Sequence, residues 1–492
     1  MGRYLALDIG AESGRLIAVT IGQNISTVEI GRFATPVTTD EKGRRCWDLP
    51  LIHAAIEEAL TKAAKSGPYR SLAVDTWGLD FALIDDHGEL VSLPVSHRDH
   101  RTDGYLAKAI AKVGRERLHG ESGCQLLEIN SIYQLFAMSE QTPEELKNAA
   151  HLQLMPDLIL YALTGVIGTE YTIASTSGLY DIVKNEWAQD LIRDFNLPNR
   201  IFGNVQPAGS IRGQLTDVWK SKTGIGELTC IATASHDTAS AVVATPLISP
   251  GSAYISSGTW SLIGVELPKP VINELTLNHR LSNEGGYNQS IRLLRNVMGL
   301  WLIQEVRKDL KIRAAQYSYD ELAEMAAAEP DPWRTLIYVD ARLFVHADEM
   351  INRIQRFAAE SDQPLPETPG QLAQCVFASL ALQYASSCDV LQQCSGMPMP
   401  AIHIVGGGSQ NQHLSQLTAD VSGREVIAGP VEAAAMGNAI VQAITLGEIE
   451  SIEAGRRLIE ASNLSFKHFQ PRQIGDLAAL RQRYGDISKK EL

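Results

Sequence analysis

The sequence has few cysteines, and none of them are paired in a metal-binding spacing. Six cysteines are scattered through 492 residues, and no Cys-x-x-Cys pair occurs. Cys388 and Cys394 are the nearest pair, but their spacing is typical of neither a zinc site nor a disulfide framework. We therefore expect free, buried thiols and a reducing compartment.

Long apolar runs are also missing. The N-terminal segment is interrupted by Asp8, which is not typical of a signal peptide. No apolar run reaches the roughly 18 residues that a membrane span needs. The sequence therefore predicts a cytoplasmic protein with no membrane partner.

Basic residues are outnumbered by acidic ones. The chain has 43 Lys and Arg against 57 Asp and Glu, a formal charge of −14. This balance argues against general nucleic-acid binding, although it leaves room for an anionic substrate at a local site. A chain of this length is too long for one core, so two or three domains are expected. As an assembly, we expect a monomer or a small homo-oligomer.

Several common catalytic and nucleotide-binding motifs are absent. The sequence contains no G-x-x-x-x-G-K-[ST] loop, and no G-x-G-x-x-G follows a predicted strand. It also lacks a G-x-S-x-G elbow and an H-E-x-x-H helix. These absences exclude a P-loop protein and disfavour a dinucleotide-binding fold.

The most informative stretch that is present runs from Ile231 to Val242. A short apolar strand ends at Ser235-His236-Asp237-Thr238, and small residues that can open a helix follow. At a helix N-terminus Asp237 should stay ionised, and it could accept a proton from a substrate hydroxyl. The alternative is a helix-capping aspartate, a common role at such a junction.

The first half of the chain has the element order of an actin-like, or ribonuclease H-type, domain. Strands are predicted over 3–9, 14–20 and near 27–34, followed by a helix over 49–65 and a buried strand over 71–77. Small residues in the first turn, at 10–13, would let backbone N–H groups approach a phosphate. Asp8 is then a candidate ligand for Mg²⁺, through water, or alternatively a turn-capping residue.

The remainder of this half is predicted from turn signals and periodicity. We expect a hairpin over 81–90, mainly helices over 102–150, and a helix over 156–165 that ends at glycine. The polar segment 169–181 is either a loop that lines a cleft or a plain surface loop.

The second half repeats this strand and turn pattern. A strand, glycine turn and strand are predicted over 252–266, a helix over 371–391, and a strand over 401–405 that opens into Gly406-Gly407-Gly408. The pattern breaks near 247–251, so we expect an α/β fold of two actin-like domains, 1–245 and 246–492, with a catalytic cleft between them.

Five segments together resemble the FGGY carbohydrate kinases: DIGAESGR, MPDLILYALTG, ASHDTASAV, SSGTWSL and HIVGGGSQN. Four further segments are similar to the members of that family that act on L-rhamnulose: 75–81, 96–102, 284–286 and 296–301. The similarity extends from about residue 3 to about residue 470. Each motif alone is moderately specific, and their common order makes the resemblance strong.

The resemblance implies ATP and Mg²⁺ as partners and transfer of the γ-phosphoryl group to the 1-hydroxyl of L-rhamnulose. It assigns the proton acceptor to Asp237, sugar binding and phosphate binding to the first domain, and nucleotide binding to the second. The implied ATP contacts are Ala11, Glu12, Ser13, Gly14, Arg15, Thr259, Gln304 and Gly407. The implied sugar contacts are Gly78, His236, Asp237, Thr238 and Asn296.

Each assignment has a structural alternative. Gly78 and Thr259 could be ordinary turn residues, and His236 a hydrogen-bonded neighbour. Asn296 and Gln304 would share a helix face if 296–306 is helical. Glu12 departs from the family pattern, in which relatives often carry Ser at this position. A carboxylate beside phosphates would repel them unless it points away or faces a metal ion.

Three other functions remain open at this level. The first is a kinase for another deoxyketose or polyol, such as L-fuculose, since sugar choice depends on a few hydrogen bonds. The second is a non-catalytic ATP-binding sensor with an actin-like fold, which would not need Asp237. The third, a carbohydrate-binding module without ATP, is disfavoured by the three glycine turns.

Overall fold

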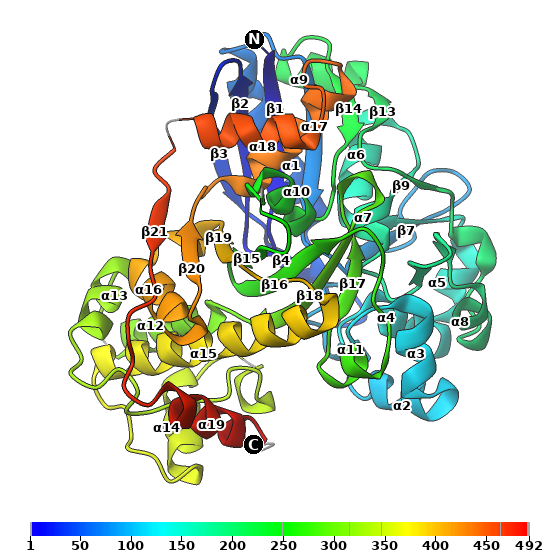
Figure 1. Cartoon of the computed structure of the whole chain (residues 1–492). Coiled ribbons are helices and arrows are strands. Elements are labelled where there is room, and N and C mark those ends of the chain that lie inside the picture. The colour runs from blue at the N-terminus through cyan, green and yellow to red at the C-terminus, as the bar shows by residue number, and fades with distance from the viewer. Residues whose placement is uncertain (1, 248, 314, 346, 463, 490–492) are drawn as a thin grey trace. The chain divides into compact units, whose positions relative to one another are not determined.

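The computed structural model describes residues 2–247, 249–313, 315–345, 347–462 and 464–489 (Figure 1). The chain forms two compact units. The first unit comprises Met1–Pro246, Glu266–Leu293 and Glu432–Asn463, and the second comprises Leu247–Val265, Leu294–Val431 and Leu464–Leu492. The chain first passes from the first unit to the second between Pro246 and Leu247. Two later segments return to the first unit, and a single cut in the sequence does not describe them.

The first unit is built on a six-stranded sheet with the order β13-β14-β6-β1-β2-β3. Strands β1, β6 and β14 run parallel, while β1, β2 and β3 form an antiparallel meander. The bounds are β1 (Gly2–Ile9), β2 (Ser13–Ile21), β3 (Ile25–Ala34), β6 (Ser71–Thr76), β13 (Ser210–Gln214) and β14 (Thr229–Ala232). This element order agrees with the strands and helix predicted from residues 3–77.

Strand alternation gives this sheet two different faces. On one face, Leu5, Leu7 and Ile9 of β1 join the apolar core formed with α1 (Leu49–Ala64) and α6 (Met155–Thr164). The opposite face contacts α17 (Ala433–Thr445), which packs against α10 (Asp237–Ala244). Asp8 alternates onto that second face, and polar groups there become part of the site described below.

The remaining elements of this unit are outside the six-stranded sheet, and one of them, β17, belongs to the second sheet described below. The strands are β4 (Val37–Thr39), β5 (Arg45–Trp47), β7 (Phe81–Ile84), β8 (His151–Leu154), β9 (Thr169–Glu170), β10 (Tyr180–Asp181), β11 (Glu186–Trp187), β12 (Val205–Gln206) and β17 (Ser282–Gly285). The helices are η1 (His100–Thr102), α2 (Tyr105–Val113), α3 (Arg115–Ser122), α4 (Ser131–Gln141), α5 (Pro143–Asn148), α7 (Tyr171–Ala174), α8 (Gln189–Asp194), η2 (Asn199–Ile201), α9 (Asp217–Thr223), α11 (Glu274–Asn278), η3 (Tyr287–Gln289) and α18 (Ile452–Ala461).

Of two local predictions for this half, the structure confirms one and excludes one alternative of the other. The hairpin expected over 81–90 is present and short: Ile84 forms an antiparallel bridge with Leu90, and the Asp85 N–H donates to the Glu89 carbonyl at 2.9 Å. The other edge of β7 pairs with β8, which the sequence did not predict. The segment 169–181 is not a surface loop but a buried stretch that contains β9, α7 and the start of β10. Here a partner from elsewhere in the chain decided the structure, since β9 pairs with β12.

A second sheet has the order β17-β18-β16-β15-β19-β20-β21. From β18 to β20 it repeats the strand order of the first sheet, with β15, β19 and β20 parallel and β16 antiparallel to β15. The bounds are β15 (Ala253–Ser257), β16 (Trp260–Leu267), β18 (Ile291–Met298), β19 (Ala401–Val405), β20 (Glu425–Ala428) and β21 (Lys467–Phe469).

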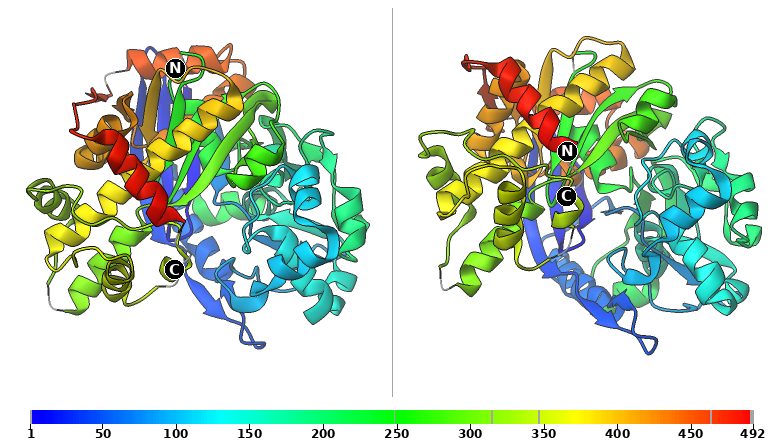
Figure 2. Two further views of the ribbon diagram at one scale, coloured as in Figure 1. Left: turned by 60° about the horizontal axis from the view of Figure 1, so that its bottom comes forward. Right: turned by 90° about the horizontal axis from the view of Figure 1, so that it is seen from below.

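Helices of the second unit gather around the long helix α15 (Pro369–Ser395), which begins at a capping box from Thr368. Near the end of the chain, α19 (Leu477–Ser488, red in Figure 2) contacts α15, where the Tyr484 hydroxyl donates to Gln383 Oε1. The other helices are α12 (Trp301–Ile312), α13 (Tyr319–Ala327), η4 (Arg342–Phe344), α14 (Met350–Glu360), η5 (Gly407–Gln410) and α16 (Gln412–Ser422).

All six cysteines are free, as expected, and five of them are buried. Burial raises the pKa of the Cys375 and Cys388 thiols to about 12. Among the described residues, no helix is long and apolar enough to cross a membrane.

Candidate active site

Three carboxylates meet at one edge of the first sheet, where its parallel strands end. Asp8 and Asp75 are register partners near the ends of β1 and β6, and Asp237 follows β14. A bridge between Thr76 and His236 fixes the approach of the third segment to the second strand. The carboxyl ends of parallel strands are where such sheets bind ligands.

Asp237 is the first residue of α10, and His236 occupies the capping position without a side-chain cap bond. Asp237 is therefore not the capping residue. Its Oδ1 accepts hydrogen bonds from the backbone N–H and the hydroxyl of Thr238. Among the described residues, Oδ2 accepts none. One oxygen is thus anchored, and the other is free to face a substrate hydroxyl.

The expectation that Asp237 stays ionised needs correction. Burial, followed by the charge of Asp8, raises the pKa of Asp237 to about 7, against the opposing effects of Thr238 and Arg292. The side chain keeps 33% of its surface exposed, yet the protein around it removes most of its hydration. The helix N-terminus does not outweigh these effects, and Asp237 titrates near neutral pH.

Asp75 is fully buried and lies at the end of a polar chain beneath α17. Ser71 Oγ donates to Gln442 Oε1 at 2.6 Å, Gln442 Nε2 donates to Asn438 Oδ1 at 2.6 Å, and Asn438 Nδ2 donates to Asp75 Oδ2 at 2.6 Å. Asp75 Oδ1 is buried without a partner. Burial and the neighbouring Asp8 raise the pKa of Asp75 well above its ordinary value.

Arg15, predicted to bind phosphate, is held by two carboxylates. Its Nη2 lies 2.6 Å from Asp8 Oδ2, and its Nη1 lies 2.6 Å from Glu432 Oε2 at the start of α17. Glu432 therefore ties the N-terminus of α17 to the first strand pair. The pairing orients Asp8 and balances its charge.

The first turn has the small-residue geometry expected of it. The Gly10 N–H donates to the Ser13 carbonyl at 2.9 Å, and Thr35 Oγ1 donates to the Gly10 carbonyl. Ala11 is half-buried, whereas Glu12 is exposed and lies 3.9 Å from Arg98 Nη2. Gly14 has a packing reason, since a Cβ there would lie 2.4 Å from the Phe33 ring.

Buried Glu170 supports the segment that carries His236 and Asp237. Its carboxylate accepts hydrogen bonds from the N–H groups of Thr172, Ile173 and Ser235 and from the Thr172 hydroxyl. The same hydroxyl accepts from the His236 N–H at 3.2 Å. Burial raises the pKa of Glu170 to about 7.

Gly78 follows β6 in the first unit, and a Cβ there would lie 3.2 Å from Thr176 Oγ1. The first unit thus holds Asp8, Gly78, His236, Asp237 and Thr238 together. Their contacts with a sugar remain predictions.

The second unit gathers the other predicted nucleotide residues where β15 and β19 end. Thr259 lies in the turn after β15, and Gln304 Nε2 approaches Thr259 Oγ1 at 3.5 Å from the first turn of α12. Gly406 has φ +80°, and a Cβ on Gly408 would lie only 2.0 Å from Ser257 Oγ. Ser257 Oγ and Gln304 Oε1 are buried without partners. The glycines thus keep a close approach open beside unpaired polar atoms.

Asn296 does not share a helix face with Gln304. It lies on β18, in the second unit, and the helix begins only at Trp301. The apolar spacing over 291–298 fits a buried strand, which sequence periodicity did not separate from a helix.

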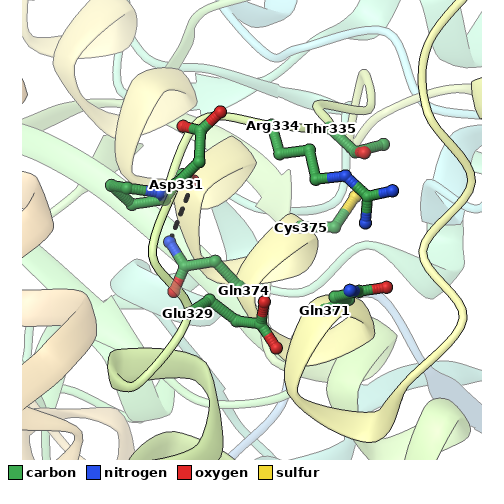
Figure 3. Close-up of a pocket in the computed structure, with 8 residues that line it drawn as sticks. Glu329, Asp331, Arg334, Thr335, Gln371, Gln374 and Cys375 are labelled. Atoms are coloured by element: carbon green, nitrogen blue, oxygen red, sulfur yellow. Dashed lines mark hydrogen bonds between the residues drawn. The ribbon is translucent and has the colours of Figure 1, made fainter.

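A small polar pocket elsewhere in the second unit includes none of the predicted site residues (Figure 3). Gln374 Nε2 donates there to the Pro332 carbonyl at 3.0 Å. Its lining is Glu329, Asp331, Pro332, Arg334, Thr335, Gln371, Gln374 and Cys375.

Family patterns match both halves of the chain. The pattern described as "FGGY family of carbohydrate kinases, N-terminal domain" matches residues 3–244, and its C-terminal counterpart matches residues 253–446. The chain belongs to the FGGY family of carbohydrate kinases. It is an enzyme, and the non-catalytic sensor considered above is not supported. Kinases of this family use ATP as the phosphate donor.

Curated relatives match this kinase over nearly its whole length. A rhamnulokinase of Enterobacter sp. (strain 638) is 38% identical over 484 residues, which cover 98% of this chain and 96% of the relative. A rhamnulokinase of Halalkalibacterium halodurans is 39% identical over 461 residues, 93% of this chain and 97% of the relative.

Solved structures agree on the fold. A ligand-bound xylulose kinase from Lactobacillus acidophilus gives a TM-score of 0.80 at 15% identity, covering 99% of this chain and 97% of its own. Plasmodium falciparum glycerol kinase with ADP gives a TM-score of 0.80 at 14% identity, covering 100% and 98%. The predicted two-domain sugar-kinase fold is confirmed.

Sequence reasoning missed several residues of the first unit. Asp75 was visible as a carboxylate near the end of a buried strand, the same signal that singled out Asp8. Glu432 precedes a helix far along the chain, Asn438 lies inside that helix, and Arg292 lies within a strand. No local pattern connects these three to Asp8 or Asp237.

Proposed function

We propose that this kinase transfers the γ-phosphoryl group of ATP to the 1-hydroxyl of L-rhamnulose, giving L-rhamnulose 1-phosphate and ADP. The observation that carries this proposal is the near full-length identity of 38–39% to proteins named rhamnulokinase. The four segments similar to L-rhamnulose kinases support it, as does the placement of His236, Asp237 and Thr238 in one turn.

Asp237 is the proposed general base. As the 1-hydroxyl oxygen bonds to the γ-phosphorus, the bond from that phosphorus to the ADP oxygen breaks, and the hydroxyl proton passes to Asp237 Oδ2. Oδ1 stays bound to Thr238, so the carboxylate does not rotate away. The pKa of about 7 lets Asp237 take up this proton and release it at neutral pH.

The residues present fit a bound Mg²⁺. Among the described residues, no group of three or more His, Cys, Asp or Glu is arranged as a metal cage. Mg²⁺ in kinases needs only one or two protein carboxylates, since water and phosphate oxygens complete its shell. Asp8 and Asp75, whose Oδ1 is buried and unpaired, would hold it. When bound, the ion neutralises charge on the phosphates.

Nucleotide binding is proposed for the glycine segment of the second unit. Gly406 and Gly408 leave no Cβ beside Ser257, and unpaired Ser257 Oγ and Gln304 Oε1 supply polar contacts. Thr259 completes this set. Ala11 to Arg15 are proposed to contribute backbone N–H groups to the phosphates, while the Arg15 side chain orients Asp8.

The test is ADP release with Mg-ATP against L-rhamnulose, L-fuculose, D-xylulose, L-ribulose, D-fructose, glycerol and a no-sugar control. We expect fast turnover with L-rhamnulose and a product whose ³¹P coupling places the ester on carbon 1. A preference for L-fuculose or a polyol would change the assigned substrate and leave the assigned reaction, phosphoryl transfer from ATP, unchanged. No rate above the control with any sugar would contradict both.

A further inference from the structure

A fully buried arginine lies behind the proposed base and has no role in the chemistry above. Arg292 is the second residue of β18, and none of its surface is exposed. Its Nε donates to the Gly285 carbonyl at 2.9 Å, and its Nη2 lies 3.3 Å from Glu284 Oε2. These contacts hold the guanidinium in one place.

The same Nη2 lies 3.1 Å from Nδ1 of His236. A guanidinium can only donate hydrogen bonds, so His236 Nδ1 must be the acceptor. Burial and the charge of Arg292 lower the pKa of His236 well below its ordinary value, so the ring is neutral. A neutral imidazole whose Nδ1 accepts carries its proton on Nε2.

The alternative tautomer conflicts with the arginine. His236 Nδ1 also lies 3.5 Å from Glu284 Oε2, so a proton on Nδ1 could point at that carboxylate. Such a proton would face the N–H of Arg292 at the shorter distance of 3.1 Å. The Arg292 contact therefore decides between the tautomers.

The other ring nitrogen faces the base. His236 Nε2 lies 3.5 Å from Asp237 Oδ1, the oxygen that already accepts from Thr238. An N–H on Nε2 is attracted to this oxygen, whereas a lone pair there would repel it. The tautomer of His236 thus acts on the orientation of Asp237.

We propose that Arg292 is a positioning residue of this kinase: by donating to His236 Nδ1, it fixes the imidazole as the Nε2–H tautomer, whose proton faces Asp237 Oδ1 and leaves Oδ2 to the sugar hydroxyl. The effect on turnover rests on the proposed function, in which Asp237 is the base. The tautomer itself does not.

The direct test is ¹⁵N NMR of the full-length protein labelled at histidine nitrogen, with the His236 signals assigned by comparison with His236→Asn. At neutral pH we expect a neutral ring with the proton on Nε2. A proton on Nδ1, or an imidazolium, would overturn the proposal. This readout is independent of activity, so it also separates a failure of the proposal from a failure of the proposed function.

The kinetic test compares Arg292→Met with Arg292→Lys. In the Met variant we expect kcat to fall by up to about tenfold, with a smaller change in the KM of the ketose. The pH profile should be displaced to higher pH, because a positive charge beside Asp237 is lost. The Lys variant keeps the charge and should keep the position of the profile while recovering part of kcat.

Arg212→Met is the matched control. Arg212 is a buried arginine of the same unit that pairs with Asp157 at 2.9 Å and has no contact with His236. Its replacement should lower stability without moving the pH profile. A folded Arg292→Met variant with unchanged kcat and profile would contradict the positioning role. If that variant does not fold, the ¹⁵N spectrum of His236 in the unmodified protein still tests the proposed tautomer.

Discussion

The two oxygens of Asp237 have different surroundings, and this difference underlies the proposed chemistry. Oδ1 is bound by Thr238 and faced by His236, while Oδ2 accepts no hydrogen bond among the described residues. A base must hold its accepting oxygen toward the substrate without losing that orientation when it gains a proton. Anchoring one oxygen achieves this.

Replacing Asp237 by Asn should abolish turnover while leaving binding in place. We expect kcat to fall by about 10²–10⁴-fold, the usual contribution of a general base, because the amide cannot take up the proton. Calorimetric titration with L-rhamnulose should give a nearly unchanged affinity. Asp217→Asn is the matched control, since Asp217 is also the first residue of a helix but is exposed. Retained turnover in Asp237→Asn would remove the assigned base.

The raised pKa of Asp237 predicts a pH profile. The base acts when it is deprotonated, so activity should be low below the pKa of about 7 and rise as the pH increases through it. We expect kcat/KM for the ketose, measured at saturating Mg-ATP, to increase from about pH 6 to a plateau at about pH 8. A flat profile over this range would show that Asp237 titrates elsewhere or is not the base.

At the scale of elements, short segments from distant parts of the chain hold the proposed site residues. The β9–α7 segment supports the Ser235–His236 turn through Glu170, and the glycine turn after β19 lies against Ser257 at the end of β15. Each contact joins a local turn to a strand end, where a small shift changes the position of a binding group.

Glu170→Gln tests the first of these supports. The carboxylate accepts from four donors, and an amide nitrogen in its place would face some of them with another donor. We expect a loss of about 1–3 kcal/mol in the free energy of unfolding and a lower kcat, measured by denaturant titration and steady-state kinetics. Glu186→Gln, an exposed change nearby, should do neither. Equal behaviour of the two variants would refute the supporting role.

Gly408→Ala tests the second contact, between the glycine turn after β19 and Ser257. Its Cβ would lie 2.0 Å from Ser257 Oγ, so the glycine turn must move. We expect the KM for ATP to rise roughly tenfold or more, with the KM for the ketose little changed, since small displacements of binding groups are costly. Gly485→Ala is the control, because a Cβ there meets no atom within 4 Å. A rise confined to the KM for the ketose would show that this turn contributes to sugar binding and not to ATP binding.

At the scale of the whole molecule, each ligand is expected to stabilise the unit that binds it. L-rhamnulose at 100 times its Kd should add about 2.7 kcal/mol to the stability of the folded state, seen as a higher Tm by calorimetry. Asp237→Asn should keep this shift, because it loses the base and not the binding surface. A shift from ATP alone, with none from any ketose of the panel, would contradict sugar binding at the first unit.

Much of this architecture followed from local patterns. The strand over 3–9, the helix over 49–65 and the buried strand over 71–77 were predicted because periodicity and turn residues act within a few positions. Failures came where distant partners decide. The segment 169–181 was buried by contacts that its polar composition does not reveal.

The sequence by itself determined the family, the repeated strand order and the position of Asp237 between a strand and a helix, because each of these is written in short contiguous motifs. Only the tertiary structure decided the protonation of Asp237 and the surroundings that control it. Burial, the charge of Asp8 and the contact of Arg292 with His236 act through space between residues far apart in the chain. Electrostatic energy depends on those distances, and a linear pattern does not contain them.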